Sequence, residues 1–111
     1  MKKYKSAIDG HLDIFVADYE ETEDGEMAKW RELLIHGDPE GLRSFAKVLL
    51  KLADLNQDDV ADLPVGAREH YHLRPNWELS KSSERVIVGR IDAKESGRFY
   101  DRYIPKDIRK K

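Results

Sequence analysis

The middle of the chain carries a capped amphipathic helix, and this feature constrains the fold most. Asp38 can accept a hydrogen bond at the N-cap, and Pro39 follows at the first helical position, where its missing N–H costs nothing. Glu40 adds a negative charge that suits the helix dipole. Apolar side chains then recur at spacings of three and four, with a basic row opposite: Leu42, Phe45, Ala46, Leu49, Leu50, Leu52 and Ala53 against Arg43, Lys47 and Lys51. The pattern predicts a helix of roughly four turns that ends near residues 55–56 and covers a core.

Alternating apolar and polar segments on both sides of this helix predict β-strands. The expected strands are residues 11–19 and 28–36 before the helix, and residues 69–74, 77–80 and 85–91 after it. The acidic segment 20–26 contains a glycine and fits a hairpin loop between the first two strands. Runs of strands separated by one helix predict an α+β fold, with an antiparallel sheet of four to five strands packed against one long amphipathic helix and a C-terminal arm.

The length and composition favour one small globular domain. The 111 residues are 40% hydrophobic and 38% charged, which is enough apolar material for one core and more charge than most globular proteins carry. We expect a single domain over residues 1–111, with its core at about 8–92 and the arm at 93–111. Pro105 ends any helix in the arm, and residues 106–111 are expected to form a frayed tail.

The sequence also excludes several classes of protein. It has no cysteine, which excludes a disulfide framework, a thiolate zinc site and a cysteine nucleophile, and which fits a reducing compartment. No run approaches the roughly 20 apolar residues that span a bilayer, and the basic start of the chain lacks the apolar stretch of a secretory signal. We therefore expect a cytoplasmic protein without a membrane segment, and nothing in the sequence forces a particular oligomeric state.

Charge is unevenly distributed along the chain. Residues 1–62 hold 15 acidic and 8 basic residues, a balance of −7, while residues 63–111 hold 7 and 12, a balance of +5, which together give the net charge of −2. Two acidic clusters stand out: Glu20, Glu21, Glu23, Asp24 and Glu26 in the first, and Asp58, Asp59 and Asp62 in the second. Each is interpreted either as a solvated surface or as a docking patch for a basic partner.

The segment Glu69-His-Tyr-His-Leu73 places two histidines on one face of a strand. His70 and His72 could form half of a metal site that His11, His36 or Glu69 completes, or they could form an ordinary polar row. The chain shows neither a serine nucleophile elbow nor a glycine-rich phosphate loop. We therefore predict no catalytic residue, no metal and no cofactor, and keep a small metal-dependent enzyme using His70 and His72 as an alternative.

The C-terminal part of the chain supports a second alternative, which is nucleic-acid binding. Basic and aromatic residues interleave there, a combination that single-stranded nucleic acids bind. The residues are Arg90, Lys94, Arg98 and Arg102, with Phe99, Tyr100 and Tyr103, followed by Arg109, Lys110 and Lys111. The sequence pI near 6.1 and the lack of a nucleic-acid-binding motif argue against this alternative.

Several of these segments together resemble a family of small bacterial immunity proteins from polymorphic toxin systems. The resemblance covers roughly residues 30–91 and is carried by His36-Gly-Asp-Pro-Glu-Gly-Leu42, the helix behind it, Glu69-His-Tyr-His-Leu73, and Leu79, Ser83 and Val86-Ile-Val88. It implies an α+β protein that binds and neutralises a cognate protein toxin without catalysis. The positions that match this pattern are interpreted as scaffold: Gly37, Leu42, Glu69, His72 and Leu73.

We therefore predict an immunity protein and place its partner-binding residues in the two acidic clusters. A basic nuclease is one candidate for the toxin, because carboxylates can occupy the phosphate sites of a basic cleft and steer association. The 20–26 segment, the strand bearing Trp30 and the aromatic arm are not explained by the family pattern.

Overall fold

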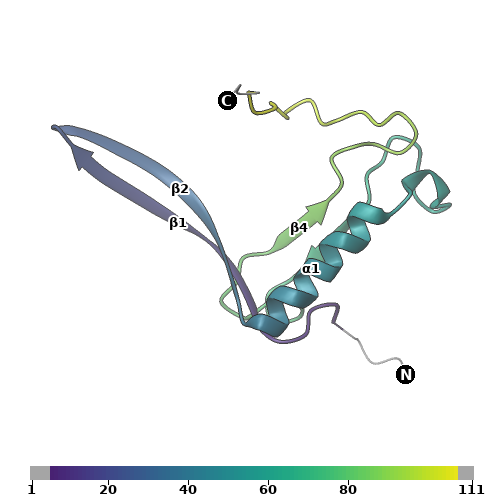
Figure 1. Ribbon diagram of the computed structural model, residues 1–111, viewed down its shortest axis with the longest axis horizontal. Coiled ribbons are helices and arrows are strands. Elements are labelled where there is room, and N and C mark those ends of the chain that lie inside the picture. Colours follow the sequence, from purple (N-terminus) through teal and green to yellow (C-terminus); the bar gives the residue numbers. More distant parts are fainter. Residues whose placement is uncertain (1–5, 108–111) are drawn as a thin grey trace.

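The computed structural model describes residues 6–107, and these form an α+β fold. The elements in chain order are β1 (Leu12–Glu23), β2 (Glu26–Gly37), α1 (Pro39–Asp54), the short 3₁₀ helix η1 (Gln57–Asp59), β3 (His70–Leu73) and β4 (Val86–Gly89). Strands β1 and β2 form one antiparallel pair, and β3 and β4 form another (Figure 1). The predicted α+β class is confirmed, but the predicted single sheet of four to five strands is wrong.

A loop, and not a further strand, occupies the outer edge of β1 where the two sheets meet. The backbone N–H of Ser80 donates to the Leu12 carbonyl at 2.9 Å, and that of Glu84 donates to the Ile14 carbonyl at 2.7 Å. The Ser83 hydroxyl accepts from the Ile14 N–H and donates to its carbonyl, both at 3.0 Å. The loop backbone and the Ser83 side chain thus make the hydrogen bonds that a further strand would make along β1. The strands therefore form two separate sheets.

The strand expected at 77–80 is absent. Asn76 has a φ of 64°, a left-handed conformation that interrupts an extended chain, and the segment makes only an isolated bridge between Pro75 and Leu79. Strands β3 and β4 are confirmed, each shorter than predicted.

The helix α1 begins as the sequence predicts. Asp38 is the N-cap, and its carboxylate accepts hydrogen bonds from the Gly41 N–H at 2.8 Å and from the His11 N–H at 3.0 Å. The Asp38 N–H in turn donates to the His11 carbonyl at 3.2 Å. The cap therefore also fastens the start of β1 to the start of the helix.

The core lies between α1, the base of β1 and the β3–β4 sheet. Its buried members are Ile8, Leu12, Ile14, Phe45, Val48, Leu73 and Leu79, with Tyr71, Val86 and Val88 packed against them. The buried stripe of α1 is narrower than predicted, because Leu42, Leu49 and Leu50 are exposed. A two-stranded sheet covers only one stripe of a helix, which leaves these side chains without a covering layer.

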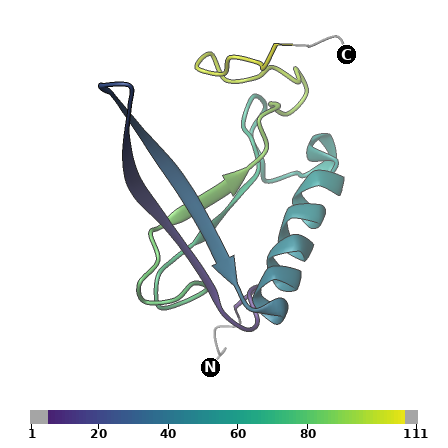
Figure 2. The same cartoon turned by 60° about the vertical axis from the view of Figure 1, so that its left-hand side comes forward.

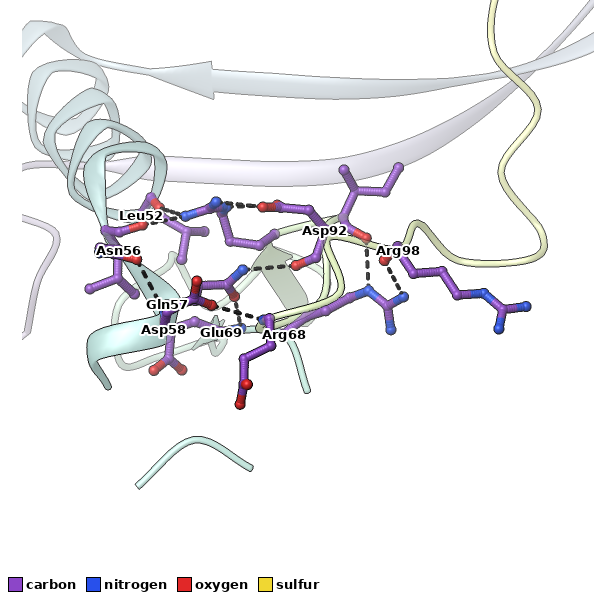
Figure 3. Close-up of polar contacts among 12 residues, drawn as sticks. Leu52, Asn56, Gln57, Asp58, Arg68, Glu69, Asp92 and Arg98 are labelled. Atoms are coloured by element: carbon purple, nitrogen blue, oxygen red, sulfur yellow. Dashed lines mark hydrogen bonds and ion pairs between the residues drawn. The ribbon is translucent and has the colours of Figure 1, made fainter. Parts of the chain in front are cut away.

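A polar junction ties the end of α1 to the chain that follows β4 (Figure 3). The Arg90 guanidinium donates to the carbonyls of Leu52 and Leu55, at 3.2 and 2.6 Å, and pairs with Asp92 at 2.6 Å. The buried Gln57 amide donates to the Asp92 carbonyl at 2.8 Å and accepts from the Glu69 N–H at 2.8 Å. These contacts provide hydrogen-bond donors to carbonyls at the C-terminal end of α1. They also hold Asp92, where the arm begins, against this end of the helix.

The lowered pKa values of three aspartates predict how the free energy of unfolding depends on pH. The pKa of Asp38 is lowered by the N–H of His11 and then by that of Gly41; the pKa of Asp13 is lowered by the hydroxyl of Ser80, and that of Asp92 by Arg90. A folded-state pKa below the unfolded value adds stability that is present above the unfolded pKa and is lost as pH falls through the folded pKa. We therefore expect the free energy of unfolding to fall from about pH 4 downward.

Asp38→Asn tests the contribution of the cap, because asparagine can still cap the helix but does not titrate in this range. Urea unfolding at pH 7 and pH 3 should show a difference between wild type and variant that shrinks at the lower pH. A difference that stays constant with pH would contradict the assignment.

Candidate partner-binding surface

The β1–β2 hairpin is longer than predicted and runs to a two-residue turn. Glu23 pairs with Glu26, and the two residues between them, Asp24 and Gly25, have φ of 52° and 80°. Positive φ at both central positions is typical of the type I′ turn that Asp-Gly favours, and this turn lets the ladder continue to the tip. The loop predicted at 20–26 is therefore wrong, because Glu20, Glu21 and Glu23 lie in β1 and Glu26 lies in β2.

The distal part of this hairpin stands free of the rest of the structure. Every residue from 18 to 33 is exposed, whereas Leu12 and Ile14 at the base are fully buried. Figures 1 and 2 show from two sides how the ribbon leaves the core and diverges from α1. The molecule measures 58 × 37 × 25 Å along its principal axes, and the hairpin accounts for much of the longest dimension.

The strand register sorts the hairpin side chains onto two different faces, because paired residues share a face. The acidic face carries Asp13, Phe15, Ala17, Tyr19, Glu21 and Glu23 from β1, and Glu26, Ala28, Trp30, Glu32, Leu34 and His36 from β2. The mixed face carries Leu12, Ile14, Val16, Asp18, Glu20 and Thr22, with Met27, Lys29, Arg31, Leu33, Ile35 and Gly37. The acidic face thus has five carboxylates and no lysine or arginine, whereas the mixed face has two acidic and two basic residues.

The acids of the mixed face stand opposite bases. Asp18 pairs with Arg31 at 3.0 Å, and Glu20 lies directly across the ladder from Lys29. On the acidic face Glu21 lies opposite Ala28 and Glu23 lies opposite Glu26. Negative potential therefore concentrates on the acidic face.

An aromatic pair lies in the middle of the acidic face. The rings of Tyr19 and Trp30 stack at 5.7 Å with an interplanar angle of 19°, and they are 39% and 41% exposed. The indole N–H of Trp30 donates to the Glu32 carboxylate at 2.8 Å, which fixes the orientation of the ring. The sequence reasoning missed this pair, although a two-residue turn at Asp24-Gly25 would have set Tyr19 opposite Trp30.

The second acidic cluster lies far from the first. Figure 1 shows η1 and the hairpin tip at opposite ends of the longest axis. Asp58 accepts from the Glu95 N–H at 2.8 Å, and Asp59 accepts from the Asn56 side chain at 3.0 Å. The carboxylates of Asp58 and Asp59 are therefore already engaged in hydrogen bonds within the chain. Asp62 is an exposed turn residue.

The two histidines of β3 share a face, as predicted. Their rings meet edge to face at 5.1 Å, and His70 Nδ1 forms a 3.0 Å hydrogen bond with the Arg68 carbonyl. Leu73 points the other way into the core, with Tyr71 packed beside it. Within residues 6–107, no group of three or more histidine, aspartate or glutamate side chains is placed to hold a metal ion.

Several cations of the C-terminal region are engaged in internal contacts. The buried Lys94 ammonium donates to the carbonyls of Val60 and Leu63, both at 2.7 Å, and Arg90 belongs to the polar junction. Arg98 pairs with Asp101 at 2.9 Å. These contacts compete with phosphate binding and weaken the nucleic-acid alternative.

The remainder of the arm is irregular between Asp92 and residue 107. The Arg68 guanidinium lies 3.9 Å from the Tyr100 ring centre, and Phe99 meets Tyr103 edge to face at 5.5 Å. Arg109, Lys110 and Lys111, which belong to the predicted basic end and frayed tail, lie outside the described residues. The one α-helix within residues 6–107 is too short and too polar to cross a membrane.

Comparisons with known proteins connect this structure to one family. A family model described as immunity protein 32 matches residues 32–91, which is 60 of the 111 residues. No curated protein and no solved structure matches the chain. The matched span includes α1, β3 and β4, and it leaves out β1, the hairpin tip and the arm.

Proposed function

Because the chain belongs to the immunity protein 32 family, we propose that it binds and neutralises a cognate protein toxin of a bacterial polymorphic toxin system. It acts by occupying a surface that the toxin needs, without catalysis of its own. We place this action in the cytoplasm, which the lack of cysteine fits. The observation that carries the proposal is the exposed acidic hairpin on a scaffold of this family.

The hairpin has the properties of a recognition element. It projects beyond the core, and its acidic residues Glu20, Glu21, Glu23, Asp24 and Glu26 gather in its distal half. Acidic groups in this position attract a basic partner from a distance and then pair with its cations at the interface. A nuclease with a basic cleft is the toxin class that this charge suits best.

The second cluster is the less suitable contact. Asp58 and Asp59 already accept hydrogen bonds within the chain, so a partner would have to compete for their oxygens. Of the three, Asp62 offers an exposed carboxylate that makes no such contact with any residue from 6 to 107. We therefore assign the primary contact to the hairpin.

The test begins with the adjacent upstream gene, where we expect a large secreted protein with a variable C-terminal toxin domain, and with co-expression of that domain and this chain. We expect growth to be restored and a complex to be isolated. Failure to restore growth would refute the immunity function.

Reversing the charge of Glu23 and Glu26 together is expected to weaken toxin binding by about tenfold or more at low salt, and to reduce its salt dependence. Because these two residues face each other, the Glu23→Lys/Glu26→Lys variant replaces one like-charge pair with another, and hairpin stability should change little. Affinity would be measured by calorimetry at several salt concentrations.

The matched control reverses two exposed acids elsewhere, Asp54→Lys with Glu84→Lys, and it should retain most of the affinity. Asp62→Lys examines the second cluster in the same assay. Unchanged affinity in the hairpin variant, with a loss in Asp62→Lys, would move the contact to residues 58–62.

A further inference from the structure

The two faces of the hairpin are not equivalent, and we infer that the toxin docks on the acidic face through an arginine-bearing surface that covers the Tyr19–Trp30 pair. This inference rests on the proposed function and assigns its contact to one side of the ribbon. The acidic face offers carboxylates and stacked rings, and among the hairpin residues assigned to it there is no lysine or arginine.

Charge is the first reason to choose this face. On the mixed face, Arg31 and Lys29 stand across from Asp18 and Glu20, so a basic partner would meet cations as well as carboxylates there. On the acidic face, Glu21 and Glu32 lie near the aromatic pair, and each has an alanine opposite it. Complementarity to a basic surface is therefore greater on the acidic face.

The aromatic pair is the second reason. Tryptophan and tyrosine are the residues most enriched among the dominant contacts of protein interfaces, where a polar rim excludes water around them. Tyr19 and Trp30 are held in a stack, and the hydrogen bond from Trp30 to Glu32 orients the indole before any partner arrives. Little side-chain freedom would be lost on binding, which favours affinity.

A contact elsewhere in the chain illustrates how a guanidinium fits such a site. Arg74 lies over the Trp77 ring at 4.6 Å and also pairs with Glu78 at 3.2 Å. An aromatic ring beside a carboxylate thus receives a guanidinium, which stacks on the ring and donates to the acid in one arrangement. Trp30 and Glu32 provide the same two groups on the acidic face without the arginine.

Other occupants fit this face less well. A second copy docked through the same face would oppose carboxylates to carboxylates, and a nucleic acid would oppose phosphates to them. In a copy docked through its basic C-terminal region, Arg90, Lys94 and Arg98 already make contacts within their own chain. Lysine would supply charge but, unlike the planar guanidinium, could not stack on the face of an aromatic ring. A basic protein surface with exposed arginine satisfies both the charge and the aromatic geometry.

Neighbouring residues provide a matched test. Glu21→Gln and Thr22→Lys each raise the net charge by one at adjacent positions of β1, one on the acidic face and one on the mixed face, and neither introduces a like-charge pair across the ladder. With the toxin domain identified in the growth assay we expect Glu21→Gln to weaken binding about tenfold or more and Thr22→Lys to change it less than about threefold. Circular dichroism and thermal melting would verify that both variants fold. Equal losses, or a larger loss for Thr22→Lys, would overturn the assignment to this face.

A peptide assay tests the chemistry without the toxin. We expect nona-arginine to bind more tightly than nona-lysine, and Trp30→Leu to abolish the preference while leaving the fold intact. Equal binding of both peptides to the wild-type chain would refute the arginine site. The growth assay is independent of this result, so the immunity function and the docking face can fail separately.

Discussion

Replacing Gly41 with alanine is expected to lower the free energy of unfolding by about 3 kcal/mol, because the added methyl group has no space. A Cβ at Gly41 would overlap the carbonyl group of His11, where the chain entering β1 crosses the first turn of α1. Gly10, with a φ of +71°, lies against the same turn, and a Cβ there would come within 2.6 Å of the Gly41 nitrogen. The substitution would force the strand away from the helix and would strain the contacts of Asp38 with both elements.

The sign of this effect is diagnostic. In an open helix, alanine in place of glycine stabilises by about 1 kcal/mol. Urea unfolding would measure the effect, and Arg43→Ala at an exposed position of the same helix is the control, with an expected change within about 0.5 kcal/mol. A more stable Gly41→Ala protein would show that strand and helix are not in close contact here.

Truncating Leu73 to alanine is expected to cost about 3 kcal/mol, since the change removes a buried side chain and leaves a cavity. Leu73 is 2% exposed and belongs to the cluster that β1, α1 and β3 share. The loss would be measured by urea unfolding and by the near-ultraviolet circular dichroism of the packed aromatic residues.

His72→Ala is the matched control for this prediction. His72 precedes Leu73 in β3 but is exposed on the opposite face, so its removal should change stability by less than about 0.5 kcal/mol. Similar losses in the two variants would contradict the assignment of one core face and one outer face to this strand.

Local patterns predicted the elements well. The Asp38 cap, the start of α1 and its end near residue 55 are confirmed, as are the first two strands and the shared face of His70 and His72. Capping, periodicity and alternation act between residues close in sequence, so their consequences can be derived without knowledge of the rest of the fold. The predicted family is also confirmed.

The candidate site was only partly predictable. The acidic composition of segment 20–26 predicts a loop, but Asp24-Gly25 favours a two-residue turn, and Glu20, Glu21, Glu23 and Glu26 lie in the two strands. A two-residue turn at Asp24-Gly25 determines which residues of the two strands pair. That register places Glu21 and Glu20 on opposite faces of the hairpin. The contrast between the acidic and mixed faces follows from that pairing and is absent from composition alone.

The sequence by itself determined the capped helix and the alternating strands, since each depends on neighbouring residues, and the net charge, which is a sum over composition. Only the tertiary structure decided that the strands form two sheets, because the loop at residues 80–84 occupies the edge of β1. It also decided that the hairpin leaves the core beyond Ile14, since Phe45, Val48 and Leu73 bury only its base. Hydrogen bonding between distant segments and the limited area of a small core set these outcomes, and no local pattern encodes either.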